Sequence, residues 1–494
     1  MEKLYDFILE ADASKKQLYF NDSPQCMYLK DGLFIPKGEK VDFLTYFNGI
    51  SVSKWKKYTT LKQLYIKGLV TGKVEIEVTR LTSTGICVID RCVVSDEFVK
   101  KLDISCELNH ILGICVCALE DSVLDYVSYY GEFTSTQILN LSVSICTFKR
   151  EKYVKNTIEK LLKFNQKYKW LKILIVDNGS TLNEENTEVL RIIHNRNLGG
   201  SGGFTRALIE NVKLQENDYV ILMDDDIDLD TSIFLRTYTL LSGLKEEYKN
   251  SFLAGSMISM EKPYIQYEKI GYRNIIKGYS YGRNIDLIDP KSLLKNELEH
   301  LDDNQFAAWW FCCIPLHRVI EIGYPLPIFI KGDDVEYSLR NNCPIMSING
   351  IGVWHESFEQ KQSLLTHYFS DRNMLILNLF FKKSTHIGFS LSLILRVMRR
   401  LITFDVKELV YLNESLIDFQ RGLKTITKDD QISKLQSLNN KEVKIVNEIT
   451  KLLVNIIKIL NQYIKIKNMY IQFRNTELNN SVFWQDYLNI NRRE

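Results

Sequence analysis

Three consecutive acids, Asp224, Asp225 and Asp226, directly follow an apolar run at 219–223. The run has the length and the β-branched residues of a buried strand, so the acids are expected where that strand leaves a sheet. Side chains alternate along an extended chain, which predicts that Asp224 and Asp226 point to one side and Asp225 to the other. Two carboxylates on one side can share Mg²⁺ or Mn²⁺ and leave coordination positions for phosphate oxygens.

Neighbouring acids and two other motifs offer alternative interpretations of this segment. Asp228 and Asp230 precede a helical pattern from Thr231 and are interpreted as helix caps. A calcium loop counted from Asp224 would need Gly at its sixth position, where the chain has Leu229, so that site is excluded. A P-loop nucleotidase is excluded because no G-x-x-x-x-G-K-[ST] motif occurs.

Other polar residues also follow apolar strands. Arg150 comes shortly after the run at 141–146, and Asp177 directly follows the run at 172–176. Ligands of open α/β sheets bind at the carboxyl ends of the strands. We therefore expect Arg150 and Asp177 to converge with Asp224.

A second acid pair and a histidine follow later in the chain. Asp333 and Asp334 lie between an apolar segment and a helical pattern, where a carboxylate can act as a general base or cap the helix. His355 follows another apolar strand. A lone histidine is more often structural, unless the acids supply a metal for it to bind.

Glycines and tryptophans add weaker signals. Asn197 opens a glycine-rich segment that ends at Gly203, and an apolar helix is expected from about Ala207. Glycines before a helix let the backbone approach a phosphate, but their order is not G-x-G-x-x-G, which argues against a dinucleotide site. Trp309 and Trp310 are adjacent and are interpreted either as core residues or as a surface that stacks on sugar rings.

The elements that must position these residues fall into three parts, and the predicted fold class is multidomain α/β. Residues 1–138 contain short period-2 segments, which are typical of a β-sandwich. Residues 139–380 alternate strands with helices around an α/β sheet, and residues 381–494 are helical. Lysines seven apart in the last part predict one basic stripe, which is either a solvated face or docks on an anionic membrane.

Composition narrows the class of protein. The 494 residues carry a net charge of +2, which gives no reason to expect a nucleic-acid partner. The 10 cysteines lack zinc-type pairing and are interpreted as buried thiols of a reducing compartment. The N-terminus does not look like a signal peptide, and no uncharged apolar run is long enough to span a bilayer, so we expect a cytoplasmic protein that touches a membrane surface at most.

Taken in order, the motifs resemble those of a known family. The segments 147–150, 176–179 and 197–204, the three acids, the tryptophan pair, the segment 331–336 and Trp354-His355 occur in the order seen in family 2 glycosyltransferases of the GT-A fold. The sequence is most similar to bacterial galactofuranosyltransferases, in the β-sandwich, the catalytic domain and the helical C-terminus. The polymerising members carry an aromatic residue before the second acid pair, whereas this chain has Gly332, which puts processive synthesis in doubt.

The resemblance implies a role for each candidate residue. The uridine diphosphate of a nucleotide-sugar donor would be bound by Arg150, Asp177 and Asn197. Mn²⁺ or Mg²⁺ would be held by Asp224, Asp226 and His355. The sugar and acceptor would be lined by Trp309, Trp310 and Asp333, and the general base would be Asp334.

The activity implied is metal-dependent, inverting transfer of galactofuranose from UDP-galactofuranose to a lipid-linked glycan of the cell wall or capsule. The enzyme would be peripheral at the inner face of the cell membrane, and homo-oligomer formation is left open. A rhamnosyltransferase that uses dTDP-rhamnose shares most of the motifs. A non-catalytic glycan-binding scaffold would also keep the fold.

Overall fold

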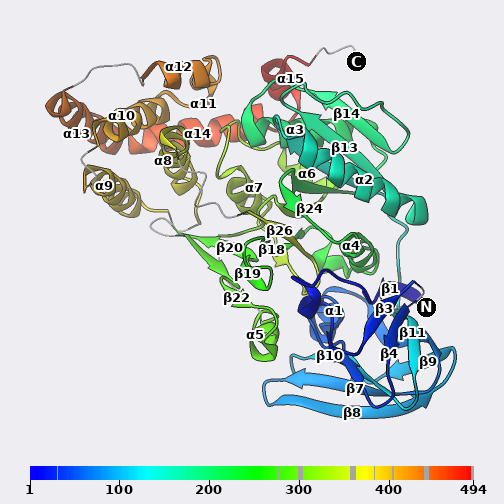
Figure 1. Ribbon diagram of the computed structural model, residues 1–494. Coiled ribbons are helices and arrows are strands. Elements are labelled where there is room, and N and C mark those ends of the chain that lie inside the picture. The colour runs from blue at the N-terminus through cyan, green and yellow to red at the C-terminus, as the bar shows by residue number, and fades with distance from the viewer. Residues whose placement is uncertain are drawn as a thin grey trace.

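The computed structural model describes residues 1–30, 32–274, 278–298, 304–356, 363–382, 384–402, 405–438 and 444–490. A β-sandwich, a central α/β region and a group of helices follow one another along the chain (Figure 1). This order confirms the predicted fold class. The boundaries at 138/139 and 380/381 stay predictions.

The N-terminal sandwich consists of two antiparallel sheets. One has the order β3-β4-β11-β6-β9, with β1 paired to β11, and the other has the order β2-β5-β10-β7-β8. In β7, Val74, Ile76 and Val78 are buried between the sheets while Glu75 and Glu77 face outward, as period-2 patterning requires. The strands, with the helix α1, are β1 (Glu2–Asp6), β2 (Asn21–Asp22), β3 (Met27–Leu29), β4 (Gly32–Ile35), β5 (Lys40–Asp42), α1 (Val52–Tyr58), β6 (Leu61–Thr71), β7 (Val74–Thr82), β8 (Gly85–Val94), β9 (Phe98–Leu102), β10 (Ile111–Ala118) and β11 (Ser122–Phe133).

The main sheet of the central region has the order β14-β13-β12-β15-β24-β17-β25. Strands β12 to β15 pair in parallel, and β24 pairs antiparallel with β15. Ile221 lies in the core that α2 shares, and Val220 lies in the core that α3 shares, so the helices cover opposite faces. The elements are β12 (Leu141–Thr147), α2 (Glu151–Tyr168), β13 (Leu171–Asp177), β14 (Leu190–His194), α3 (Gly199–Leu214), β15 (Tyr219–Asp224), α4 (Ser232–Ser242), β17 (Phe252–Ala254), β24 (Phe311–Pro315), α6 (Leu316–Ile322) and β25 (Ile345–Met346).

A second sheet, β16-β26-β18-β19-β22, and a three-stranded sheet, β21-β20-β23, complete this region. Strand β16 follows directly on the three acids and pairs with β26, which ends at His355. The pairing therefore brings the histidine to the end of β15. The elements are β16 (Ile227–Asp228), β18 (Ser256–Ser259), β19 (Ile265–Glu268), β20 (Ile270–Arg273), β21 (Gly278–Tyr281), β22 (Ile285–Asp286), α5 (Pro290–Lys295), β23 (Gln305–Phe306), α7 (Asp333–Asn341) and β26 (Gly352–His355).

Helices make up the described C-terminal part, and most of them contribute to the core that α3 shares. They are α8 (Leu364–Asn378), α9 (His386–Ile402), α10 (Val406–Arg421), α11 (Leu423–Ile426), α12 (Gln431–Leu438), α13 (Ile445–Asn461), α14 (Tyr463–Glu477) and α15 (Val482–Leu488). The last of these packs against α3 (Figure 1). Within the described residues, no helix combines the length and apolar character needed to cross a membrane.

The sandwich and the central region share one continuous hydrophobic core. The guanidinium of Arg236 in α4 is buried 3.6 Å from the ring centre of Tyr5 and donates to the carbonyl of Phe47. Lys15 Nζ lies 2.5 Å from Asp228 and 4.0 Å above the ring of Trp354, beside His355. The sandwich thus supports the strand that carries the histidine.

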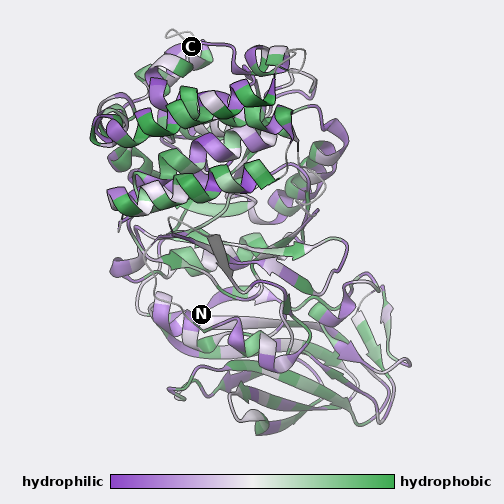
Figure 2. Ribbon diagram, turned by 90° about the vertical axis from the view of Figure 1, so that its left-hand side faces the viewer, coloured by the Kyte–Doolittle hydropathy of each residue, from purple (hydrophilic) through white to green (hydrophobic). Residues whose placement is uncertain are grey.

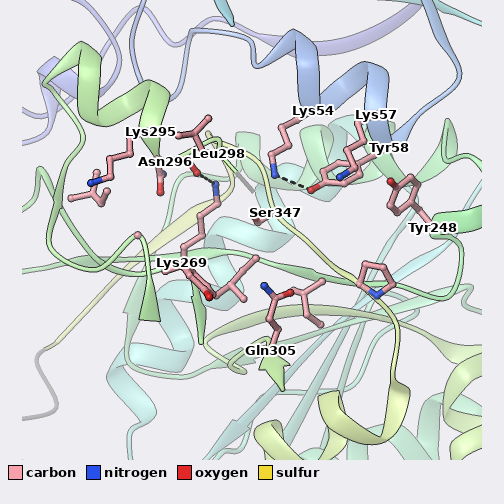
Figure 3. A pocket seen from close by; sticks show the side chains of 16 residues that line it. Lys54, Lys57, Tyr58, Tyr248, Lys269, Lys295, Asn296, Leu298, Gln305 and Ser347 are labelled. Atoms are coloured by element: carbon pink, nitrogen blue, oxygen red, sulfur yellow. Dashed lines mark hydrogen bonds between the residues drawn. The ribbon is translucent and has the colours of Figure 1, made fainter. Parts of the chain in front are cut away.

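A pocket of about 220 Å³ lies between α1 and the elements around β19 and β22 (Figure 3). Lys54 donates to the hydroxyl of Tyr58 at 3.0 Å, and Lys269 donates to the carbonyl of Asn296 at 3.0 Å. None of the predicted site residues is among the residues that line this pocket. This pocket is therefore separate from the site predicted at the ends of the central strands.

Candidate active site

The register of the central sheet places the predicted polar residues at one edge. Thr147 pairs with Asp177, and Cys146 pairs with Asp224, so β12, β13 and β15 end together. Arg150 follows β12 as the N-cap of α2. The carboxyl ends of parallel strands are where open α/β sheets bind ligands.

Asp224, Asp226 and His355 lie together at this edge. Their ligand atoms are all within 4.8 Å of one another. His355 Nε2 is 3.1 Å from Asp226 Oδ1 and 3.6 Å from Asp224 Oδ2. Asp224 stays half-exposed, whereas the other two side chains are buried, so the group is reachable from one side.

The histidine is oriented by its other nitrogen. His355 Nδ1 lies 2.6 Å from the carbonyl oxygen of Glu356, which directs Nε2 toward the acids. Burial would lower the pKa of His355, but hydrogen bonds and charge from Asp224 and Asp226 outweigh burial and raise it to about 10. Two carboxylates and one correctly oriented imidazole are a donor set that fits Mn²⁺.

The position of Asp225 differs from the simple alternation that the sequence predicts. Arg150 Nη1 lies 3.0 Å from Asp225 and 2.6 Å from Asp226, so one guanidinium bridges both carboxylates. Asp225 also accepts from Thr147 Oγ1 at 2.7 Å. Strand β15 ends at Asp224, and strict alternation ends with it.

The second acid pair opens helix α7 close to the first cluster. Burial, with charge from Asp334 and Asp224, raises the pKa of Asp333. Burial and the charge of Asp224 raise the pKa of Asp334, while Arg273 opposes the rise. The charge of Asp224 acts on both acids, so the second acid pair lies near the end of β15. Arg273 was not predicted from the sequence, because nothing in the spacing of β20 distinguishes it.

The loop before these acids has an unusual backbone. Phe329, Lys331 and Gly332 have φ values of 74°, 64° and 99°, in the left-handed region that non-glycine residues rarely adopt. Gly332 precedes the helix without a side-chain cap, so Asp333 is a first-turn residue and not the cap. Such a loop persists only when its surroundings hold it.

Two side chains of α8 hold this loop. The amide of Asn373 donates to the carbonyls of Ile328, Ile330 and Lys331 at 3.0, 2.7 and 3.0 Å. Arg372 also donates to the carbonyl of Ile328, at 2.9 Å. Sequence reasoning missed both, because a polar pair inside a helical pattern gives no signal of what it contacts.

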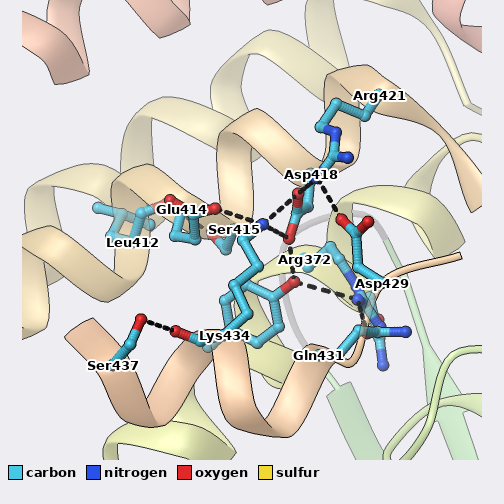
Figure 4. Close-up of polar contacts among 12 residues, drawn as sticks. Arg372, Leu412, Glu414, Ser415, Asp418, Arg421, Asp429, Gln431, Lys434 and Ser437 are labelled. Atoms are coloured by element: carbon cyan, nitrogen blue, oxygen red, sulfur yellow. Dashed lines mark hydrogen bonds and ion pairs between the residues drawn. The ribbon is translucent and has the colours of Figure 1, made fainter. Parts of the chain in front are cut away.

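Arg372 belongs to a buried polar network of the C-terminal helices (Figure 4). It donates to Gln431 at 2.6 Å and to the hydroxyl of Tyr368 at 3.1 Å, and that hydroxyl donates to Asp418 at 2.7 Å. Lys434 and Arg421 also contact Asp418. The helical region is therefore tied to the loop that carries the second acid pair.

Two residues predicted to bind the donor have contacts within their own loops. Asp177 is fully buried, and its carboxylate accepts from the backbone N–H groups of Gly179, Thr181 and Leu182 at 2.8, 2.6 and 2.8 Å. Asn197 is half-buried and accepts from Gly199 N at 3.1 Å. This arrangement favours a positioning role for Asp177. Donor binding by Arg150, Asp177 and Asn197 stays a prediction.

The glycine-rich segment is helical rather than a loop. Helix α3 begins at Gly199 and not near Ala207, so that prediction is wrong. A side chain at Gly203 would place its Cβ 2.1 Å from Cys146 Sγ, and one at Gly199, where φ is +71°, would lie 2.2 Å from the carbonyl oxygen of Phe329. The glycines allow α3 to pack closely on β12 and on the loop before α7, which contains Phe329.

The adjacent tryptophans are buried in different cores. Trp310 is 6% exposed and donates its indole N–H to the carbonyl of Gly255 at 2.9 Å. Trp309 is 5% exposed and packs against Phe204 and Tyr337. In this conformation neither ring has an open face for stacking on a sugar. The Trp309 N–H is buried without a hydrogen-bond partner among the described residues.

Two family models match the sequence. Residues 142–236, from β12 into α4, match the family Glycosyl transferase family 2. Residues 10–112, in the sandwich, match the family Galactofuranosyltransferase 2 N-terminal. These two matches confirm the resemblance found in the sequence.

Curated relatives include two proteins named Galactofuranosyltransferase GlfT2. The one from Mycolicibacterium smegmatis is 24% identical over 427 residues, 80% of this chain and 66% of that protein. The one from Mycobacterium tuberculosis is 25% identical over 435 residues, 80% of this chain and 67% of that protein. The aligned part of the chain thus spans about two thirds of the length of these relatives.

Among solved structures, a fragment of TarS from S. aureus is 13% identical, and the match covers 66% of this chain and 92% of that chain with a TM-score of 0.36. So distant a likeness supports no argument about the site.

Proposed function

We propose that the protein is a metal-dependent, inverting glycosyltransferase that moves galactofuranose from UDP-galactofuranose to a lipid-linked glycan acceptor of the cell surface. Mn²⁺ or Mg²⁺ would be held by Asp224, Asp226 and His355. The names of the curated relatives support the sugar, and the family 2 domain supports the class of reaction.

The observation that carries the proposal is the concentration of carboxylates at the end of β15. Asp224, Asp225 and Asp226 lie there with their cationic partners Arg150 and His355. The charge of Asp224 also acts on Asp333 and Asp334. Burial raises the pKa of Asp225 to about 6, with the charges of Asp226 and Asp224 adding to the rise. An excess of crowded negative charge favours a bound cation.

In the proposed reaction, Asp334 accepts the proton of the acceptor hydroxyl as that oxygen attacks the anomeric carbon. A single displacement from the opposite side inverts that carbon. A bound cation would stabilise negative charge on the departing diphosphate. Arg273 favours the ionised form of Asp334, and the loop held by Asn373 fixes its position.

A lipid-linked acceptor would bring the enzyme to a membrane surface. The described C-terminal helices expose apolar side chains, and Figure 2 shows the hydrophobic residues along the helices on this side of the molecule. On α9 these include Ile387 and Ile402, and on α13 Leu453 and Ile457. Lys451 and Lys458 are exposed on α13, whereas Arg396 and Arg400 turn inward to Asp371. Apolar residues flanked by lysines suit a peripheral contact with anionic lipid.

The proposed transfer can be tested by nucleotide release. The protein is incubated with UDP-galactofuranose, other UDP-sugars or dTDP-rhamnose, with a synthetic lipid-linked galactofuranose acceptor, and with Mn²⁺ or a chelator. We expect uridine diphosphate only from UDP-galactofuranose, and only with both metal and acceptor.

Two other outcomes of this experiment would support a different function. Turnover of dTDP-rhamnose alone would replace the sugar assignment with the rhamnosyltransferase alternative. Glycan binding without turnover of any donor would contradict the proposal and support a non-catalytic scaffold.

A further inference from the structure

A second group of ligand-type side chains lies on the N-terminal sandwich, outside the acid cluster. Cys115 and Cys117 are two residues apart on β10, so both point to the same face of the sheet. Glu77 is directly opposite Cys115 on the neighbouring strand β7. Their neighbours Ile114, Val116 and Ile76 fill the core, which puts the three side chains on the outer face.

These side chains are close enough to share one ion. One thiol sulfur from each cysteine and one oxygen of Glu77 all lie within 4.8 Å of one another. A tetrahedral Zn²⁺ ion, with bonds of about 2.3 Å to sulfur and about 2.0 Å to oxygen, needs its ligands roughly 3.5–3.8 Å apart. Side-chain rotations that move each ligand atom by about 1 Å would bring the atoms from within 4.8 Å of one another to the separations that the ion needs.

The environment suits a partly shielded metal site. Cys115 is buried and Cys117 and Glu77 are half-buried, so an ion can enter from solvent beside Cys117. Asp42 pairs with Cys115 from the other side, on β5, and its carboxylate or a water molecule could supply a fourth ligand. Arg91 contacts Glu77 at 2.8 Å, but its side chain is 60% exposed and can move away at little cost.

We propose that Cys115, Cys117 and Glu77 form a binding site for a thiophilic divalent cation of the zinc class, separate from the metal site of the proposed transfer reaction. Paired thiolates select such cations over Mg²⁺ or Mn²⁺, which prefer oxygen ligands. Binding would replace the two thiol protons, which pass to solvent, by two metal–sulfur bonds. The ion would cross-link β7 to β10 and stiffen the sandwich. None of its three ligands takes part in the proposed transfer, so this cation site is independent of that reaction.

Titration of the reduced full-length protein with Cd²⁺ tests the site. Cadmium bound to thiolates gives a charge-transfer absorption band in the ultraviolet, which Asp224, Asp226 and His355 cannot give because they lack sulfur. We expect the band to saturate at one equivalent and to be abolished by competing Zn²⁺. Binding should also raise the melting temperature of the protein.

Three variants separate the proposed site from the other thiols. Cys117→Ser should remove about half of the band and weaken binding about tenfold or more. Glu77→Gln should weaken binding while the band per bound ion stays unchanged, since both thiolates remain. Cys87→Ser, at an exposed thiol on the adjacent strand β8, is the matched control. It should change neither the absorption band nor the affinity for Cd²⁺.

Two results would overturn the proposal. One is the absence of a band at one equivalent of Cd²⁺ in the wild-type protein. The other is a band that responds to Cys87→Ser as strongly as to Cys117→Ser, which would indicate unspecific binding to surface thiols.

Discussion

Asp334 has a raised pKa and lies near the predicted metal ligands Asp224, Asp226 and His355. Burial and the charge of Asp224 disfavour its ionised form, so its pKa lies above the ordinary value of about 3.9 for an aspartate. As the proposed general base, Asp334 must be ionised to accept the proton of the acceptor hydroxyl. Activity should therefore be complete above the raised pKa and fall as the pH drops through it.

Substitution of Asp334 tests this role. Asp334→Asn keeps the shape of the side chain but cannot accept the proton, so we expect kcat to fall about 10²–10⁴-fold. Because the variant has no carboxylate at this position, the acidic limb of its profile of kcat/KM against pH should also disappear. The measurement is nucleotide release across pH, and an unchanged acidic limb in the variant would contradict the assignment.

Individual residues differ in how far the sequence could predict them. Asp224, Asp226 and His355 each follow an apolar strand, and strand ends meet at one edge, so their proximity could be predicted. For Trp309 and Trp310 the sequence left two interpretations open, core residues or a sugar-stacking surface, because nothing local says what covers each ring. Asp177 was placed correctly at the edge, but its contacts with the following loop depend on backbone conformation.

At the scale of elements, helix α3 depends on close approach to β12. Gly203→Ala would force a Cβ to within 2.1 Å of Cys146 Sγ, where overpacking should lower the free energy of unfolding by about 1–3 kcal/mol. Gly200→Ala, in the same turn, meets only Phe204 at 3.9 Å and is the matched control. It should be neutral or stabilising by up to about 1 kcal/mol, because alanine favours a helix more than glycine does. Equal effects of the two changes in a denaturant titration would contradict this packing.

The strained loop before α7 gives a second prediction at this scale. Asn373→Ala removes the amide that holds the carbonyls of Ile330 and Lys331, so Asp334 should lose its fixed position. We expect kcat to fall about 10–100-fold, the range that misplacement of a reacting group by about 1 Å causes, while KM for the donor changes little.

The control for Asn373 is Asn378→Ala. Asn378 is equally buried in α8 but bonds to Ser392 and not to the loop. Both changes should destabilise the protein, and only Asn373→Ala should slow turnover. Loss of kcat in both variants would indicate a purely structural effect.

Element types were predictable because the hydrophobic period is strong, but the start of α3 was not. Glycine disfavours helices, so the local sequence predicted a loop up to Ala207. Packing against Cys146 and the Phe329 loop outweighs that propensity, and those contacts come from distant parts of the chain. The same reasoning applies to Asn373, whose partners lie more than 40 residues away.

At the scale of the whole molecule, the three parts support one site. The sandwich contacts the strand of His355 through Lys15, and α8 holds the loop of Asp334. The sequence could predict the three parts but not these contacts. Hydrophobic periodicity and composition describe each part separately and say nothing of how the parts touch.

The exposed apolar helices give a prediction for the whole molecule. Leu453→Glu combined with Ile457→Glu places two charges on one face of α13, where 57% and 58% of these residues are exposed. If this face meets lipid, sedimentation with anionic phospholipid vesicles should fall severalfold, since carboxylates resist transfer into the interface. Ile320→Glu, at a residue 60% exposed on α6, is the control and should have no effect.

Manganese binding, followed by electron paramagnetic resonance, tests the central claim most directly. We expect one strongly bound Mn²⁺ per chain in the wild-type protein, with binding lost in Asp226→Asn and His355→Ala. Asp228→Asn should bind normally, because Asp228 is paired with Lys15 and Lys160 and not with the cluster. Wild-type protein without bound Mn²⁺, or cluster variants that bind it as well as the wild type, would contradict the proposed metal-dependent active site.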